Sequence, residues 1–219
     1  MTPDYQRAAI KATETLIKYG IKTAPVDPLP VIKQIPGVFV MTFAEASDKA
    51  HMDRKDLLDL YGCENLDAVT NVYISEDKKH YVVTYNRLLP SRIVDMALAR
   101  ELGHIVLEHD GTRPEDVRDE EARCFARHLL FPRPLIKAIQ ETGIPITTEF
   151  LGNVTGCYER CQSCLAYTPG AHVPPELNKM VREQFADYVA NLKDYHAFLS
   201  KGEQSTEVDF GTYMDNYCE

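Results

Sequence analysis

The sequence predicts an α+β fold in which a small three-stranded sheet packs with a helical bundle. Short segments rich in Val, Tyr and Phe, at 37–43, 69–75 and 80–86, are typical of strands. "EDKK", which separates the last two segments, predicts a hairpin turn. After Leu88 the apolar residues follow helical spacing. With 219 residues, the chain is long enough to bury one substantial core.

The helices are expected to begin near the N-terminus. Thr2-Pro3-Asp4 is a typical helix start, with a capping hydroxyl and an early proline, and Gly20 is a typical end. "TAPVDPLP", with three prolines, predicts a rigid connector. Four more helices are predicted in the second half of the chain, at about 91–109, 114–131, 133–142 and 147–165.

One long C-terminal helix is expected at 171–200, following a domain at 1–170 and preceding an acidic, flexible tail at 201–219. Its apolar residues alternate at spacings of four and three, and they are Val181, Phe185, Tyr188, Leu192, Tyr195 and Leu199. This seam between 181 and 199 must be covered by the body of the protein or by a second chain in a homodimer. The seam lasts for fewer than three heptads, which favours packing within one chain.

The amino-acid composition limits which partners the protein is expected to bind and in which cellular compartment it is expected to lie. The net charge of −9 argues against a nucleic-acid-binding surface, because phosphate contacts require clustered Lys and Arg. No segment has the length and apolarity of a signal core or a membrane span. Six cysteines without a secretion signal favour reduced thiols. We therefore expect an acidic, soluble, cytoplasmic protein.

The stretch "MALARELGHIVLEHDG" at 96–111 is similar to a zinc-peptidase helix. Arg100 and His104 are four residues apart and share a helix face, and Glu101 stands where such a helix carries its general base. Gly103 removes a side chain, which predicts close packing at that point. Taken alone, this pattern also fits a core histidine beside a solvated glutamate.

The order of motifs from about Ile21 to Pro134 resembles the ImmA/IrrE family of zinc metallopeptidases, which act beside phage-type and stress-response repressors. The resemblance rests on "IKTAPVDPLPVIKQIPGVFV", on "YVVTYN", on "MALARELGHIVLEH" and on "EEARCFARHLLFP". It implies a zincin-like core. It also implies that His104 and Glu121 are zinc ligands and that Glu101 is the catalytic base. At the position of the first zinc histidine, however, this chain has Arg100.

Arg100 argues against the zinc cofactor that the family implies. A catalytic zinc requires three protein ligands and a water, and a guanidinium has no lone pair to donate. Three interpretations remain. Arg100 could pair with Glu121 or Glu101 and replace the cation, giving a pseudoenzyme. Another residue could complete a zinc site, with Cys124 lining it and His109 and His128 as further candidates. The helix could also be purely structural.

The resemblance implies a regulatory protein of phage or mobile-element type that recognises a protein partner such as a repressor. If zinc were bound, the family's mechanism would have Glu101 activate a water for hydrolysis of the repressor chain. Whether this chain is an enzyme depends on Arg100.

The spacing Cys157-x3-Cys161-x2-Cys164 is the spacing of a radical-SAM iron–sulfur motif. Only 55 residues follow Cys164, too few for the barrel of such an enzyme. The cysteines also form a helical stripe, which favours core packing over zinc, cluster or redox roles.

Overall fold

The computed structural model describes residues 1–53, 55–56, 59, 66–75, 78–155 and 171–200. The strands are β1 Val38–Thr42, β2 Ala68–Ser75 and β3 Lys78–Tyr85. The helices of the first half are α1 Tyr5–Lys18, α2 Pro28–Lys33 and α3 Phe43–Ala50. Those of the second half are α5 Ser91–Val106, α6 Glu115–Leu130, α7 Arg133–Glu141, α8 Thr148–Thr155, α10 Pro175–Gln184 and α11 Ala186–Ser200.

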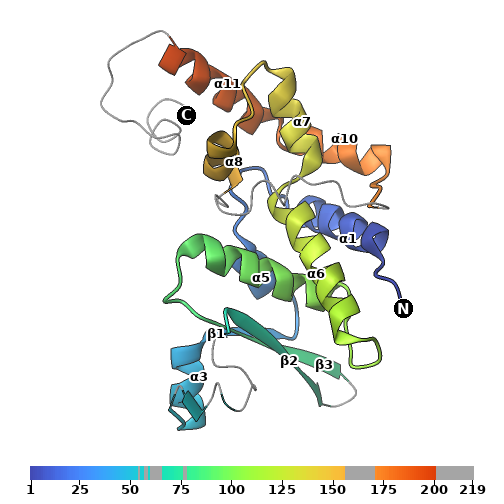
Figure 1. The fold of residues 1–219 in the computed structure, drawn as a ribbon, viewed down its shortest axis with the longest axis vertical. Coiled ribbons are helices and arrows are strands. Elements are labelled where there is room, and N and C mark those ends of the chain that lie inside the picture. The colour runs from blue at the N-terminus through green and yellow to red at the C-terminus, as the bar shows by residue number, and fades with distance from the viewer. Residues whose placement is uncertain (54, 57–58, 60–65, 76–77, 156–170, 201–219) are drawn as a thin grey trace.

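The arrangement is the predicted α+β fold. The sheet has the order β1-β3-β2, with β1 parallel and β2 antiparallel to β3. Figure 1 shows the sheet and α3 at one end of the molecule, α5 and α6 in the middle, and α7, α8, α10 and α11 at the other end. Among the described residues, β2 is an edge strand, and α5 packs on both β2 and β3.

The main core lies where α1, α5 and α6 meet. Leu16, Leu102 and Phe125, one from each helix, are almost completely buried there. A smaller core forms beneath α3, where Phe43 and Ala46 pack against Met41 and Val69 and cover part of the opposite face of the sheet. Burial of apolar side chains from both faces of the sheet holds the strands against the helices.

Several local predictions needed correction at the helix starts and turns. The α1 cap is Asp4, whose carboxylate accepts from the Arg7 N–H, rather than Thr2. The proline-rich connector contains α2, which begins at the Asp27 cap. Lys78 and Lys79 of the predicted hairpin turn already belong to β3.

The expected long C-terminal helix is interrupted at Phe185, where φ is −95° and ψ is 7°. The bend lets α10 pack on α1 and α7 while α11 follows α7. Val181, Phe185, Tyr188 and Leu192 are buried within the single chain. The body of the protein therefore covers this part of the 181–199 seam.

The predicted tail at 201–219 and part of the predicted helix at 147–165 lie outside the described residues. In the described part, no helix has the length and apolarity needed to cross a bilayer.

Candidate functional site

Two packed helices, α5 and α6, bring together the residues that the resemblance selected. Gly103 makes this approach close. A Cβ at that position would lie 3.1 Å from Phe125 Cδ1 and 3.2 Å from the Cα and carbonyl oxygen of Ala122. The prediction that Gly103 marks tight packing is therefore confirmed. The neighbouring His104 and Glu121 consequently project into the same region from facing helices.

The Glu121 carboxylate is buried, with 1% of the residue exposed, and both of its oxygens accept hydrogen bonds. Oε1 accepts from the backbone N–H of Asp4 at 2.7 Å. Oε2 accepts from Arg113 Nη1 at 2.8 Å and from His109 Nε2 at 2.9 Å. Arg113 supplies the positive charge, because a buried carboxylate is stable only when it is paired and hydrogen-bonded. The expected partner, Arg100, does not form this pair.

The two histidines at the end of α5 form a short hydrogen-bonded chain. The Nδ1 atoms of His104 and His109 are 2.9 Å apart. Burial lowers the pKa of His104 to about 4 and lowers that of His109, so both rings are neutral at pH 7. His109 must donate from Nε2 to the carboxylate of Glu121, so its Nδ1 accepts and the Nδ1–H of His104 donates. His104 Nε2 then carries a lone pair and lies 3.6 Å from Asp119 Oδ1.

Glu101 projects from α5 toward the sheet. It is 5% exposed, and its Oε2 accepts from Thr70 Oγ1 of β2 at 2.7 Å. Burial raises the pKa of this carboxyl, while the hydrogen bond from Thr70 and the charge of Arg100 act in the opposite direction. A raised pKa is a property of general bases, and structural carboxyls in cores share it.

Arg100 is partly buried beside Glu101 and lines the same cavity, but its Nε is buried without a hydrogen-bond partner in the described part of the chain. The first interpretation, in which Arg100 pairs with Glu121 or Glu101, is therefore corrected. Arg113, from the loop before α6, is the residue that pairs with Glu121. The reason is geometric, since Glu121 faces the α5 C-terminus and the N-terminal segment.

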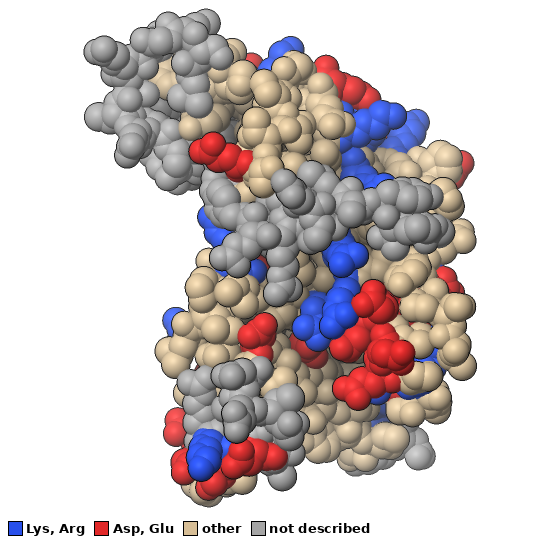
Figure 2. All heavy atoms as spheres, in the orientation of Figure 1, with Lys and Arg blue, Asp and Glu red and all other residues tan. Residues whose placement is uncertain are grey.

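A cavity of about 330 Å³ opens between β2, α5 and the start of α6. Its walls carry both charges and apolar groups. The charged residues are Arg100, Glu101, Glu115, Arg118 and Asp119. The apolar ones are Leu66, Ala68, Val69 and Val72, and Thr70, Tyr81, His104 and His109 complete the lining. Figure 2 shows Lys/Arg and Asp/Glu side chains side by side near the middle of this face of the molecule.

The other candidate ligands lie elsewhere. Cys124 is buried in the main core, its thiol is 3.6 Å from the carbonyl oxygen of Tyr5, and it is not among the described residues that line the cavity. Burial raises the pKa of this thiol to about 11, so it is protonated at neutral pH. His128 lines a different cavity. Only His109, of the three substitutes, contacts His104. The stripe of Cys157, Cys161 and Cys164 lies outside the described residues.

Sequence reasoning overlooked the roles of Arg113, Thr70 and Asp4. No motif marks them, because each reaches the site from a loop, a strand or the N-terminal segment rather than from α5 or α6. Asp119, which faces His104, was equally absent from the prediction, although its place two residues before Glu121 was a signal that could have been used.

A catalytic zinc needs three protein ligand atoms with lone pairs that point at one place. The residues of this site can be compared with that requirement. Both Glu121 oxygens already accept hydrogen bonds, from Asp4, Arg113 and His109, and Arg100 cannot act as a ligand. Of the family-type ligands, His104 Nε2 keeps its lone pair, while the Glu121 carboxylate is already paired with Arg113. Among the described residues, no three His, Cys, Asp or Glu side chains are grouped so that they could hold a metal ion. The donor set in this structure does not fit a catalytic zinc.

Comparison with known proteins identifies the segment that carries this site. Residues 63–157 match the family described as the IrrE N-terminal-like domain, Peptidase M78. No curated protein and no solved structure matches the chain. The matched segment includes α5 and α6, with Glu101, His104 and Glu121. Residues 63–157 are therefore similar to an IrrE N-terminal-like domain, and this similarity supports a zincin-like fold and the resemblance to the ImmA/IrrE family of metallopeptidase-like proteins.

Proposed function

We propose that this protein is a non-catalytic relative of the ImmA/IrrE peptidases that binds an extended segment of a protein partner. The observation that carries the proposal is the state of Glu121. The carboxylate that would hold zinc is instead neutralised by Arg113 and accepts further hydrogen bonds from His109 and the Asp4 N–H. Groups supplied by the chain itself therefore perform the electrostatic role of the ion.

Partner binding is supported by the cavity beside β2. An edge strand presents unpaired backbone groups, which an extended peptide can use to add a strand. Val72 lines the cavity and is 44% exposed, and the lining also carries two cations, Arg100 and Arg118, and the carboxylates of Glu115 and Asp119. A partner segment with apolar and charged side chains would complement these walls. The partner class that the family resemblance implies is a repressor-like protein, in a phage or mobile-element setting.

Metal analysis tests the non-catalytic part of this proposal. We expect protein purified without added zinc to contain substoichiometric zinc by mass spectrometry, and we expect calorimetry to show no tight site. Stoichiometric zinc that disappears in His104→Ala would overturn it. Peptide cleavage that Glu101→Gln abolishes would do the same, and would favour a zinc peptidase that uses His109, the one substitute that contacts His104.

Peptide selection tests the binding part. A displayed peptide library should yield ligands whose affinity falls at least tenfold in Val72→Asp. Tyr73→Asp is the matched control, because its side chain is exposed on the opposite face of the same strand. Equal losses in both variants, or no selected ligand, would contradict binding at this cavity.

A further inference from the structure

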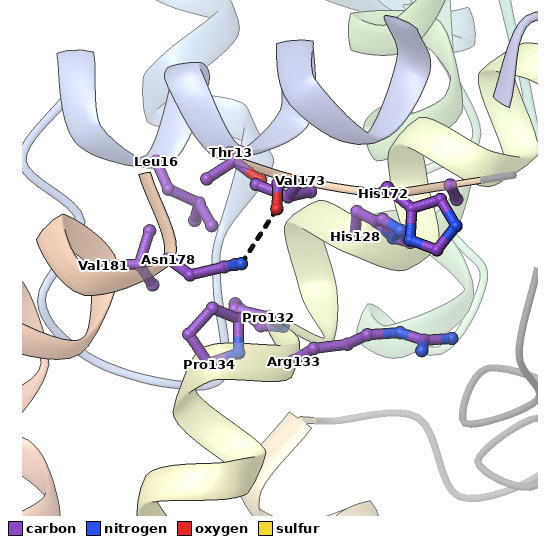
Figure 3. A pocket seen from close by; sticks show the side chains of 11 residues that line it. Thr13, Leu16, His128, Pro132, Arg133, Pro134, His172, Val173, Asn178 and Val181 are labelled. Carbon is purple, nitrogen blue, oxygen red and sulfur yellow. Dashed lines mark hydrogen bonds between the residues drawn. The ribbon is translucent and has the colours of Figure 1, made fainter. Parts of the chain in front are cut away.

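Arg100 and Arg133 each line a cavity, and they differ in whether they already have a partner. Arg133 lines a cavity of about 210 Å³ between the C-terminal end of α6, the N-terminal end of α7, α1 and α10 (Figure 3). There the Asn178 amide donates to the Val173 carbonyl at 3.1 Å, and Arg133 already has an interaction partner. Arg100, in the cavity beside β2, forms no ion pair and no hydrogen bond with any described residue. Its charge is therefore open to a ligand.

The accessible part of Arg100 is the terminal end of its guanidinium. The residue is partly exposed and lines the cavity of about 330 Å³. Its Nε is buried without a partner in the described part of the chain. The two Nη atoms also form no hydrogen bond there, but they are not among the buried atoms, so they keep contact with solvent. An anion that enters the cavity can reach these two atoms without displacing an existing ion pair.

The carboxylates of the same cavity are directed elsewhere. Glu101 turns toward β2 and accepts a hydrogen bond from that strand at 2.7 Å, although its carboxyl still feels the charge of Arg100. Asp119, on α6, lies 3.8 Å from Arg123. Glu115 lies in the first turn of α6, and none of the three forms an ion pair with Arg100 among the described residues. A partly buried guanidinium without a paired carboxylate favours a ligand that supplies one.

We propose that Arg100 anchors a carboxylate of the partner segment, carried by an acidic side chain or by a free C-terminus. The guanidinium offers parallel N–H groups that match the two oxygens of a carboxylate, and this pairing is stronger and more directional than a neutral hydrogen bond. Glu115 and Asp119 repel a carboxylate placed beside them, which favours the single position at Arg100. The inference rests on the proposed function, because it names the chemistry of the peptide that binds beside β2.

Peptide libraries displayed with free C-termini test this proposal on the whole chain. We expect the selected ligands to share a carboxylate, either an Asp or Glu at one position or the terminal group. Replacing that residue with Asn or Gln, or amidating the terminus, separates the two sources, and the change that removes the anchored group should weaken binding about tenfold by calorimetry. Ligands whose affinity depends on neither change would overturn the anchor and leave peptide binding beside β2 intact. No selected ligand would overturn both proposals.

Variants of the protein identify the group that pairs with this carboxylate. Arg100→Gln should bind the parent ligand about tenfold more weakly, and removing the ligand's carboxylate should then cost less than about twofold more. Arg123→Gln is the matched control and should bind as the parent protein does, because this arginine is exposed, pairs with Glu120 and is not among the described lining residues. A carboxylate effect of equal size in the parent and in Arg100→Gln would refute the assignment.

A second variant keeps the test open if Arg100→Gln does not fold. Arg100→Lys retains the positive charge but loses the planar pair of N–H groups, so we expect several-fold weaker binding of the same ligand. Binding as tight as that of the parent protein would refute pairing with the guanidinium.

Discussion

Glu121 receives its hydrogen bonds from three parts of the chain that are far apart in sequence. The Asp4 N–H comes from the N-terminal segment, His109 from the residues after α5, and Arg113 from the loop before α6. A buried carboxylate held in this way ties those three segments to α6. Glu121, which the family resemblance implies as a zinc ligand, therefore contributes to the stability of the fold.

Replacing Arg113 should expose the cost of this buried charge. We expect Arg113→Met to lower the free energy of unfolding by about 2–3 kcal/mol, because Glu121 is left without its cation. Urea denaturation would measure the change. Arg123→Met is the control, since its ion pair with Glu120 is exposed and should cost about 0.5 kcal/mol. Adding Glu121→Gln to Arg113→Met should recover part of the loss, and simple additivity would contradict this account.

His128 should make stability depend on pH. Its pKa is about 4 in the fold and near 6.5 in an unfolded chain, so the unfolded state takes up the proton first on acidification. The stabilisation by the neutral ring is complete above pH 6.5 and is lost as the pH falls toward 4. Relative to His128→Leu, the parent protein should lose about 1–3 kcal/mol across this range. Urea titrations of both proteins at several pH values would measure it, and parallel curves would disprove it.

At the scale of elements, the α5–α6 contact depends on a missing side chain. Gly103→Ala places a Cβ against the Ala122 backbone, where neither helix can move without disturbing the other. Overpacking of about 1–3 kcal/mol is partly offset by about 1 kcal/mol of better helix propensity, so we expect a net loss near 1 kcal/mol. Thermal unfolding would show this loss. Gly111→Ala, with no atom within 4 Å of the added carbon, should stay within about 0.5 kcal/mol of the parent.

The elements that sequence predicted well were those with strong periodicity. The strands, α5, α6 and α7 follow their patterns to within a few residues. α3 was missed even though Thr42 and Glu45 form a capping box that the letters Thr-x-x-Glu indicate. α2 was also missed, because the prolines of this segment were taken to indicate a connector. Proline is equally common in the first turn of a helix, which is where α2 has it. The break at Phe185 has no local sequence signal, and the structure shows it together with the packing of α10 on α1 and α7.

For the site, sequence could select Glu101, His104 and Glu121 because they lie on two recognisable helices. It could not select the partners of Glu121, which tertiary contacts bring from distant loops. Arg100 shows the same limit. The sequence predicted that an arginine would neutralise the buried carboxylate of Glu121. The arginine that does so is Arg113, thirteen positions later along the chain.

At the scale of the whole molecule, the C-terminal helices should stabilise one chain rather than join two. Phe185 is fully buried within the chain. We expect Phe185→Ala to cost about 3–5 kcal/mol of unfolding free energy. We also expect the urea midpoint of the parent protein to be independent of protein concentration, as equilibrium unfolding at several concentrations would show. Met180→Ala, at an exposed position on α10, is the control. A midpoint that rises with concentration would indicate a dimer.

The bonds to Glu121 also bear on whether this site can acquire a metal. The substitution Arg100→His would add an imidazole at the position of the family's first zinc histidine but leave the carboxylate held by Arg113, His109 and Asp4. Metal binding by Glu121 would require loss of contacts that stabilise the fold, so each variant on the way to a metal site would be a less stable protein. For the non-catalytic protein proposed above, the obstacle to binding a metal would therefore lie in Arg113, in the loop before α6, as well as in Arg100.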